Sequence, residues 1–419
     1  MATNSRNAES FIARLCGTEQ PEEILRRLSP RSDDLPPRIP GASLAGEEAV
    51  GRRWKLLAEG ARPLLWNGES LEVFSNNIEN VIGTLSVPVA VAGPLRVNGC
   101  AAHGDYYVPL ATTEAALVAS YTRGCVAIGE SGGCATLILG EGVIRTPGFI
   151  FSNLQEAGSF VSWSLQNRDE FARQAESTTS HGKLNDLRFL VEGNHVYLIL
   201  EFFTGDAAGQ NMVTIATQAV CDWIAANSPV KARYQFVEAN LSGDKKASAQ
   251  SFQNIRGRKV AAECVVTPEV LEKRLHTTAG EMEEYWRMSA LGGVLSGTIG
   301  VQGHYANGLA ALFLATGQDV ACVSEAAVGV TRFEARKDGS LYTAVTLPNL
   351  ILGTVGGGTG LPTQAACLDI LGLRGSGHAR ALAEVAAALC LAGELSIIAA
   401  LAAGHFTRAH KKLARGKSE

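Results

Sequence analysis

The sequence predicts an α/β protein with more than one domain, and three observations support this prediction. Its 419 residues exceed the size at which a single hydrophobic core usually divides. Apolar residues make up 46% of the chain and charged residues 19%, a balance typical of a large, well-buried protein rather than a disordered one. Strand-like and helix-like segments alternate between residues 147 and 236, which indicates a compact α/β unit.

The order of the expected elements follows from the local patterns. Residues 1–69 combine charge, prolines and short helical patterns such as 45–59, and we expect an N-terminal helical arm. Residues 81–95 are rich in β-branched side chains and interrupted by glycine and proline, which indicates strand and turn. Later segments predict helices at 115–128, 169–177, 211–227 and 268–297, and strands at 186–191, 195–203 and 260–266.

Charge and cysteine usage narrow the class of protein. A net charge of only −4 argues against a general nucleic-acid binder. The nine cysteines form no C-x-x-C pair and no zinc-ligand spacing, so we expect reduced thiols, no metal site and a cytoplasmic protein. The apolar stretch 381–406 contains Glu384 and Glu394 and the glycines 393 and 404, which favours a buried helical hairpin over a membrane span.

Two glycine-rich segments are candidate ligand loops. Residues 205–212 follow a strand and open a helix, where backbone N–H groups can bind a phosphate, although the G-x-G-x-x-G fingerprint is absent. A plain strand-to-helix connection is the more common explanation of such a turn. Residues 353–359 include three consecutive glycines, which are costly in backbone entropy, so a ligand contact is as well supported as a tight turn.

Four charged positions are candidate acid–base groups, and each also has a simpler explanation. Lys245 lies in a polar loop that reads as a solvated charge run. Glu114 precedes an apolar helix, where the helix dipole favours a carboxylate. Asp319 lies near the end of an apolar helix, which is unfavourable without a partner. His410 lies five residues after His405, which is not a helical metal spacing.

The order of these segments resembles one enzyme family. Together they are similar to the signatures of hydroxymethylglutaryl-CoA reductases, specifically the soluble catalytic portion of the biosynthetic class, over roughly residues 70–412. The matching segments are 78–95 (IENVIGTLSVPVAVAGPL), 109–124 (PLATTEAALVASYTRG), 205–212, 244–246, 317–319, 353–359 and 392–410 (AGELSIIAALAAGHFTRAH).

The resemblance implies a domain plan. A large CoA-binding domain of helices and sheet would comprise residues 70–146 and 237–400, and a small NAD(P)H-binding α/β domain, 147–236, would be inserted into it. Residues 1–69 would form the arm and 401–419 a C-terminal flap. The family forms its active sites across a dimer interface, so a homodimer with shared sites, or a tetramer of such dimers, is expected.

The resemblance also implies a reaction. NADPH, with NADH as the alternative, would reduce the acyl-CoA thioester in two hydride transfers, converting hydroxymethylglutaryl-CoA to mevalonate and CoA. Lys245 would stabilise the developing oxyanion and Glu114 would donate a proton from a secluded site. Asp319 would lie between them and tune both, and His410 would protonate the departing CoA thiolate.

Further residues are implied by the match to family motifs. The residues expected to bind substrate are Glu79, Arg145, Glu238, Asn240, Lys246, Arg287, His304 and Asn307. The residues expected to bind the cofactor are Asp206, Gly209, Asn211, Met212, Ser180, Lys183, Gly356, Gly357 and Gly358.

One position departs from the family in a way that bears on the substrate. The family has Ser-Gly-Asn where this chain has Glu238-Ala-Asn240, and that serine helps bind the free carboxylate of the substrate. Glu238 either pairs with Arg145 or Arg287, leaving a pocket for another acyl group, or rotates away and leaves the ordinary substrate. A non-catalytic homologue that binds CoA or nucleotide is the third hypothesis, and the complete set of four acid–base residues argues against it.

Overall fold

The structure is a computed structural model that describes residues 36–404, except for residues 42 and 58. The chain divides into two compact units, Met1–Thr84 and Leu85–Glu419. The expected catalytic residue His410, and most of the expected flap 401–419, lie outside the described residues.

The described part of the first unit consists of short helices around a small apolar core. Arg53 is buried there, and its Nη1 donates a hydrogen bond to the Val81 carbonyl oxygen at 2.6 Å. The helical pattern at 45–59 is confirmed as α3, while residues 81–88 are irregular rather than strand. The elements are α3 (Glu47–Trp54), η1 (Glu59–Ala61), α4 (Arg62–Leu65) and η2 (Glu72–Phe74).

The larger sheet of the second unit is mixed, with the strand order β2-β1-β3-β8-β11-β10-β9. β1 and β3 are parallel, as are β9 and β10, and the other neighbours are antiparallel. The strands are β1 (Val89–Gly99), β2 (His103–Ala111), β3 (Cys134–Arg145), β8 (Gly257–Val266), β9 (Gly300–Val301), β10 (Gly329–Ala335) and β11 (Leu341–Leu350).

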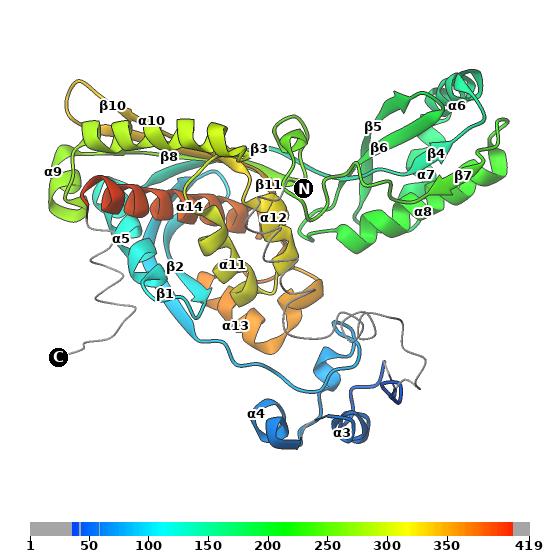
Figure 1. Cartoon of the computed structure of the whole chain (residues 1–419), viewed down its shortest axis with the longest axis horizontal. Coiled ribbons are helices and arrows are strands. Elements are labelled where there is room, and N and C mark those ends of the chain that lie inside the picture. The colour runs from blue at the N-terminus through cyan, green and yellow to red at the C-terminus, as the bar shows by residue number, and fades with distance from the viewer. Residues whose placement is uncertain (1–35, 42, 58, 405–419) are drawn as a thin grey trace, which may run out of the picture. The chain divides into compact units, whose positions relative to one another are not determined.

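Helices pack against this sheet and against one another (Figure 1). The helical region expected at 268–297 is broken by His276, which has a left-handed backbone, and resumes at the capping box formed by Thr278 and Glu281. The helical segments are α5 (Leu117–Glu130), η3 (Ala249–Phe252), α9 (Pro268–Val270), η4 (Leu271–Leu275), α10 (Ala279–Ser296), α11 (Tyr305–Thr316), η5 (Val320–Cys322), α12 (Val323–Ala326), η6 (Gly357–Gly360), α13 (Pro362–Leu371) and α14 (Ala379–Ala402).

Helix α14 is the central helix of this core (Figure 1). The expected hairpin is wrong, because residues 379–402 form one continuous helix. Gly393 does not end it, since its missing side chain makes room for the ring of Tyr121 on α5. The helix is long and apolar enough to span a membrane, but 78% of its most apolar window is buried inside the protein, as expected of a core helix.

A second, smaller sheet lies at the far end of β3 and forms a separate lobe in Figure 1. β6 (His195–Phe203) is its centre, flanked by β5 (Lys183–Glu192) on one side and by β3 and β4 (Gly148–Ile150) on the other, with β7 (Tyr234–Phe236) beyond β4. The lobe also contains α6 (Leu154–Gln166), α7 (Arg168–Glu176) and α8 (Gln210–Asn227). The α/β fold class is therefore confirmed, including the alternating pattern at 147–236.

Strand β3 joins the two sheets. Its residues 135–142 pair with β8 of the larger sheet, and its last three residues pair with β6 of the smaller one. Arg145 is the last of these residues, so this expected substrate-binding side chain lies at the junction between the sheets.

Candidate active site

Lys245 and Asp319, two expected catalytic residues, form an ion pair. Lys245 Nζ lies 2.9 Å from Asp319 Oδ2, with 44% and 39% of the two side chains exposed. The hydrogen bond to Asp319 raises the pKa of Lys245 above its ordinary value. Burial would raise the pKa of Asp319, but hydrogen bonds from Lys245 and from the Ala321 N–H outweigh it, so the pKa of Asp319 is lowered. Both groups are therefore charged near neutral pH.

Asp319 lies near the end of an apolar helix, as its position in the sequence suggested, but outside that helix. Helix α11 ends at Thr316 with Gly317 as its C-cap, and Asp319 instead caps η5 by accepting a hydrogen bond from the Ala321 N–H at 3.0 Å. This N-cap and the bond to Lys245 together supply the partners that an isolated carboxylate would lack.

Arg145 is largely buried and bonded to protein acceptors. Its Nη1 donates to Glu238 Oε2 at 3.2 Å and to Asp244 Oδ2 at 3.3 Å, and its Nη2 donates to the Gln210 carbonyl oxygen at 3.4 Å. Glu238 also accepts from the Thr146 hydroxyl at 3.0 Å. Of the two expectations for Glu238, pairing with Arg145 is the one observed. Arg287 instead pairs with Glu283 and Glu284 on its own helix.

Glu114 and Asn307 form a second pair. Asn307 Nδ2 donates to Glu114 Oε1 and Oε2 at 3.1 and 3.2 Å, and the Glu114 side chain is exposed in the single chain. Glu114 lies before α5, which begins at Leu117. Beside it, His304 precedes α11, and its Nδ1 lies 3.2 Å from Oε1 of the buried Glu394. Nδ1 is thereby engaged, which leaves Nε2 as the ring nitrogen available to another group.

The two pairs lie at opposite ends of α11. Asn307 is in the first turn of this 12-residue helix, whereas Asp319 follows its C-cap. A helix of that length spans about 18 Å. Within the described part of one chain, Asp319 thus contacts Lys245 and not Glu114; the expectation that it lies between them concerns a site shared by two chains and stays a prediction.

The two glycine-rich segments lie side by side. Val355 forms a parallel β-bridge with Ala207, and the Thr354 N–H donates to the Asp206 carbonyl oxygen at 2.9 Å. The approach requires glycine at 353, because a Cβ there would lie 2.6 Å from the Ala208 nitrogen. The Asp206 carboxylate accepts hydrogen bonds from the Gly377 and Ala379 N–H groups, so it caps the start of α14 in this structure.

The start of α8 lies next to the Lys245–Asp319 pair. Gln210 is the first residue of α8, follows the left-handed Gly209, and accepts from Arg145 through its carbonyl oxygen. Its side-chain Nε2 lies 2.9 Å from Sγ of Cys322, in the short helix that Asp319 caps. The dipole of α8 thus directs its positive end toward the site.

The remaining expected cofactor residues lie on three segments, at 180–183, in the first turn of α8 and at 356–358. The Thr179 hydroxyl lies 3.1 Å from Met212 Sδ, which brings the exposed Ser180 and Lys183 to that end of the helix. Asn211 is exposed in the same turn. Gly356 and Gly357 have left-handed backbones with φ of 75° and 55°, and Gly358 packs against the backbone of Gly317, two residues before Asp319.

Three expected substrate residues are exposed and not part of these contacts. Lys246 donates through Nζ to the Asp244 carbonyl oxygen at 2.9 Å. Asn240 has a left-handed backbone with φ of 62°. Glu79 lies in the first unit, where its side chain is exposed.

Comparison with known proteins identifies the family. The family model described as hydroxymethylglutaryl-coenzyme A reductase matches residues 51–415. The chain belongs to the hydroxymethylglutaryl-coenzyme A reductase family. Curated 3-hydroxy-3-methylglutaryl-coenzyme A reductases of Pyrococcus horikoshii and Methanothermobacter thermautotrophicus are 44% and 45% identical to it, over 82% and 81% of this chain and 85% of each relative.

Solved structures agree with the fold of this family member. A class II 3-hydroxy-3-methylglutaryl-CoA reductase from Streptococcus pneumoniae, bound to NADPH in open conformations, matches with a TM-score of 0.65 and 21% identity. The match covers 79% of this chain and 89% of that chain. At this identity the likeness concerns the fold alone.

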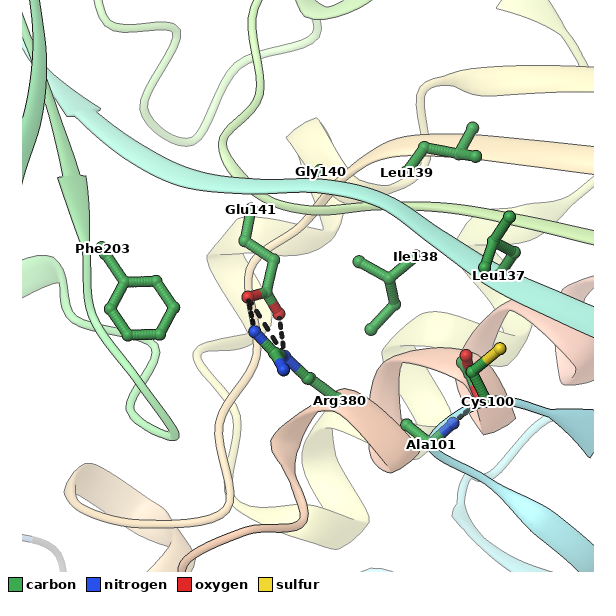
Figure 2. Close-up of a pocket in the computed structure, with 10 residues that line it drawn as sticks. Cys100, Ala101, Leu137, Ile138, Leu139, Gly140, Glu141, Phe203 and Arg380 are labelled. Carbon is green, nitrogen blue, oxygen red and sulfur yellow. Dashed lines mark hydrogen bonds and ion pairs between the residues drawn. The ribbon is translucent and has the colours of Figure 1, made fainter.

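A cavity of about 540 Å³ lies elsewhere in this family member, and Figure 2 shows its lining. Arg380 pairs there with Glu141, with Nη2 2.8 Å from Oε2, beside Phe203 and Cys100. None of the expected site residues within 36–404 lines this cavity. Glu141 also binds Arg258, which donates to the Gly205 carbonyl oxygen, so the cavity lies behind the glycine-rich turn.

Sequence reasoning missed the buried groups behind Lys245, namely Arg256 and Glu325. Arg256 is buried and donates to Glu325 Oε2 and Asp244 Oδ1, each at 2.6 Å. Arg256 stands in a run of basic residues, so only Glu325 gave a signal, because it lies in an apolar stretch. Charged residues in such places require partners.

Proposed function

We propose that this chain reduces hydroxymethylglutaryl-CoA to mevalonate and CoA, using two molecules of NADPH. The observation that supports this most directly is the Lys245–Asp319 ion pair beside the start of α8 and the paired glycine-rich segments. An ammonium group held next to a nucleotide-binding helix start is the arrangement that hydride transfer to a carbonyl requires.

The residues present fit NADPH at this place. Backbone N–H groups at the start of α8 would bind the pyrophosphate, and the left-handed glycines at 209, 356 and 357 leave room for it. Ser180 and Lys183 are exposed where they would meet the 2′-phosphate of NADPH, although NADH remains the alternative. We assign residues 147–236 to the cofactor-binding domain and 70–146 with 237–400 to the CoA-binding domain. The bound cofactor supplies the hydride.

Lys245 would stabilise the negative charge that develops on the carbonyl oxygen when hydride adds. The first addition gives a hemithioacetal, which collapses to an aldehyde as the CoA thiolate departs and takes a proton from His410. The second hydride addition and one proton give the primary alcohol. Glu114 is the proposed donor to the carbonyl oxygen, with Asn307 holding its carboxyl group.

A homodimer with shared active sites is part of the proposal, with a tetramer of dimers as its extension. Glu114 is exposed and about a helix length from Lys245 in one chain, whereas a proton donor requires a secluded site close to the oxyanion. Helix α10 also exposes an apolar stripe, Met288, Leu291 and Leu295, at helical spacing. A second copy on this stripe would bury it and bring the two halves of the site together.

The substrate's carboxylate would be bound near Arg145, together with Lys246 and Arg287, and Asn240 and His304 would contact other parts of the substrate. Arg145 Nε is buried without a hydrogen-bond partner among the described residues. Glu238 accepts a hydrogen bond from the Arg145 guanidinium, which leaves fewer donors for the substrate's carboxylate. Reduction of another acyl thioester is therefore the second candidate function.

Turnover tests the proposal directly. NADPH oxidation is measured with hydroxymethylglutaryl-CoA and with a panel of other acyl-CoAs, and mevalonate is identified by mass spectrometry. Lys245→Ala is expected to lower kcat by at least about 10²-fold while leaving the melting temperature nearly unchanged. Lys337→Ala, an exposed lysine in the β10–β11 turn, is the control. Unchanged kcat in Lys245→Ala would refute the role of Lys245, and turnover of no thioester would refute the function.

A further inference from the structure

The loop that presents Lys245 has a strained backbone. Lys245 has a φ of 55°, Gly243 a φ of 74° and Asn240 a φ of 62°. Left-handed backbone is uncommon for a lysine and costs about 1–2 kcal/mol. Such a conformation persists only where surrounding contacts determine it, so the contacts that hold this loop are relevant to where the ammonium group points.

One buried ion pair makes those contacts. Glu325 is fully buried in α12, and its Oε1 accepts from the backbone N–H of Lys245 at 3.3 Å. Its other oxygen accepts from Arg256 Nε at 2.6 Å, and Arg256 Nη2 donates to the side chain of Asp244 at 2.6 Å. The pair thus holds the backbone of Lys245 and the side chain of the residue before it.

Arg256 directly precedes β8 and is itself fixed by contacts that do not involve the loop. Its Nη1 donates to the Ile144 carbonyl oxygen at 2.9 Å, at the end of β3, and its backbone N–H donates to Asn349 Oδ1 at 3.1 Å. The guanidinium therefore connects the end of β3 and α12 to the loop, while the backbone N–H of Arg256 is bonded to β11. A buried ion pair contributes little net stability compared with apolar residues of the same volume, so a positioning role accounts for it better than a stabilising one.

We propose that Arg256 and Glu325 are positioning residues that fix the left-handed Lys245 peptide and thereby direct its ammonium group toward Asp319 and the substrate oxyanion. This inference rests on the proposed reductase function for its kinetic consequences, but not for its structural one. Neither residue touches the substrate, because both are buried behind the loop.

Glu325→Gln is the first test, because glutamine keeps the volume and can accept from the Lys245 N–H but loses the charge that holds Arg256. The proposal predicts a fall in kcat of about 10²-fold, since misplacement of a catalytic group by about 1 Å has that effect. KM changes little, because Lys245 acts on charge that develops in the transition state. Arg256→Lys should show the same fall in kcat with little change in KM.

Glu384→Gln is the matched control. Glu384 is also fully buried and also accepts backbone N–H groups, those of Ala101 and Ala102 between β1 and β2, and it has no contact with the Lys245 loop among the hydrogen bonds of the described residues. Both variants are expected to lower the melting temperature, but only Glu325→Gln should lower kcat. Equal effects on kcat would overturn the proposal.

A double variant separates the effect on positioning from an effect on folding. Arg256→Met with Glu325→Leu replaces the ion pair by apolar side chains, which commonly restores stability. The proposal predicts a recovered melting temperature with kcat still low, and recovery of kcat along with stability would overturn it.

Competitive acetylation of lysines, read by peptide mass spectrometry, tests the positioning without turnover. Loss of the Asp319 contact lowers the pKa of Lys245, so at pH about 9 its reactivity relative to Lys337 should rise severalfold in Glu325→Gln. Unchanged reactivity would contradict the proposal. A wild-type protein that turns over no substrate yet shows this rise would refute the function and keep the inference.

Discussion

Lys245 Nζ lies 2.9 Å from Asp319 Oδ2, and the contact joins a loop after the smaller sheet to the segment that follows α11. The two residues are 74 positions apart in the sequence. Lys245 has a left-handed backbone, and Asp319 is the N-cap of η5. Local backbone geometry thus fixes both members of the pair. Each member shifts the pKa of the other, so the loss of either one changes the pKa of the residue that remains.

Asp319→Asn should lower the pH at which activity is lost on the alkaline side. The carboxylate raises the pKa of Lys245, so its removal lets that pKa fall toward the ordinary 10.5 and moves the alkaline limb of kcat to lower pH. The lowered pKa of Asp319 also stabilises the fold above the pKa of the unfolded carboxyl, and this is lost as the pH falls through the folded value. The melting temperature of the Asp319→Asn variant should therefore depend less on pH in the acid range than that of the wild type. An alkaline limb that stays in place would show that Lys245 does not set it.

Glu238→Ser should lower KM for hydroxymethylglutaryl-CoA. Glu238 accepts one hydrogen bond from Arg145 Nη1, and its removal leaves that donor for the substrate's carboxylate and removes a like charge. One charge-assisted hydrogen bond corresponds to about 1.5–3 kcal/mol, which is at least about tenfold in KM. Steady-state kinetics on this substrate and on mono-carboxylic acyl-CoAs measure the change.

Glu238→Gln is the control for that change, because it keeps the bond to the Thr146 hydroxyl while removing the charge. A rise in KM for the serine variant would count against the altered-pocket interpretation and assign Glu238 to the support of the loop.

The particular residues show where sequence reasoning succeeded and where it could not. Local patterns predicted the strand–turn–helix around residues 195–227 because hydrophobic period and glycine placement are local properties. The motifs also led to Lys245 and Asp319, which the fold brings into contact. The Arg256–Glu325 pair could not be predicted, because 69 residues separate them and only the fold brings the residue before β8 next to α12. The prediction of a hairpin at 381–406 was wrong. A glycine such as Gly393 usually indicates the end of a helix, but here it lies within the helix and makes room for the Tyr121 ring.

Two glycines of α5 should respond to alanine with opposite signs. A Cβ at Gly124 would lie 1.8 Å from the Ala392 carbonyl oxygen of α14, so Gly124→Ala should force the two helices apart and destabilise the fold by about 1–3 kcal/mol. Nothing lies within 4 Å of a Cβ at Gly129, so Gly129→Ala should stabilise the helix by up to about 1 kcal/mol. Urea unfolding of both variants measures the difference. Equal effects would mean that α5 and α14 do not approach this closely.

Leu291→Asp should break the proposed dimer and with it the activity. Leu291 is 61% exposed in the apolar stripe of α10, and a carboxylate buried there at an interface would lack a partner. Light scattering should show a shift from dimer to monomer, and kcat should fall because Glu114 and Lys245 would no longer meet across the interface. Leu154→Asp, at a leucine of similar exposure on α6, is the control and should leave both mass and kcat unchanged. A monomeric Leu291→Asp variant with full activity would show that one chain forms the complete site, and that Glu114 reaches Lys245 by a movement within the chain.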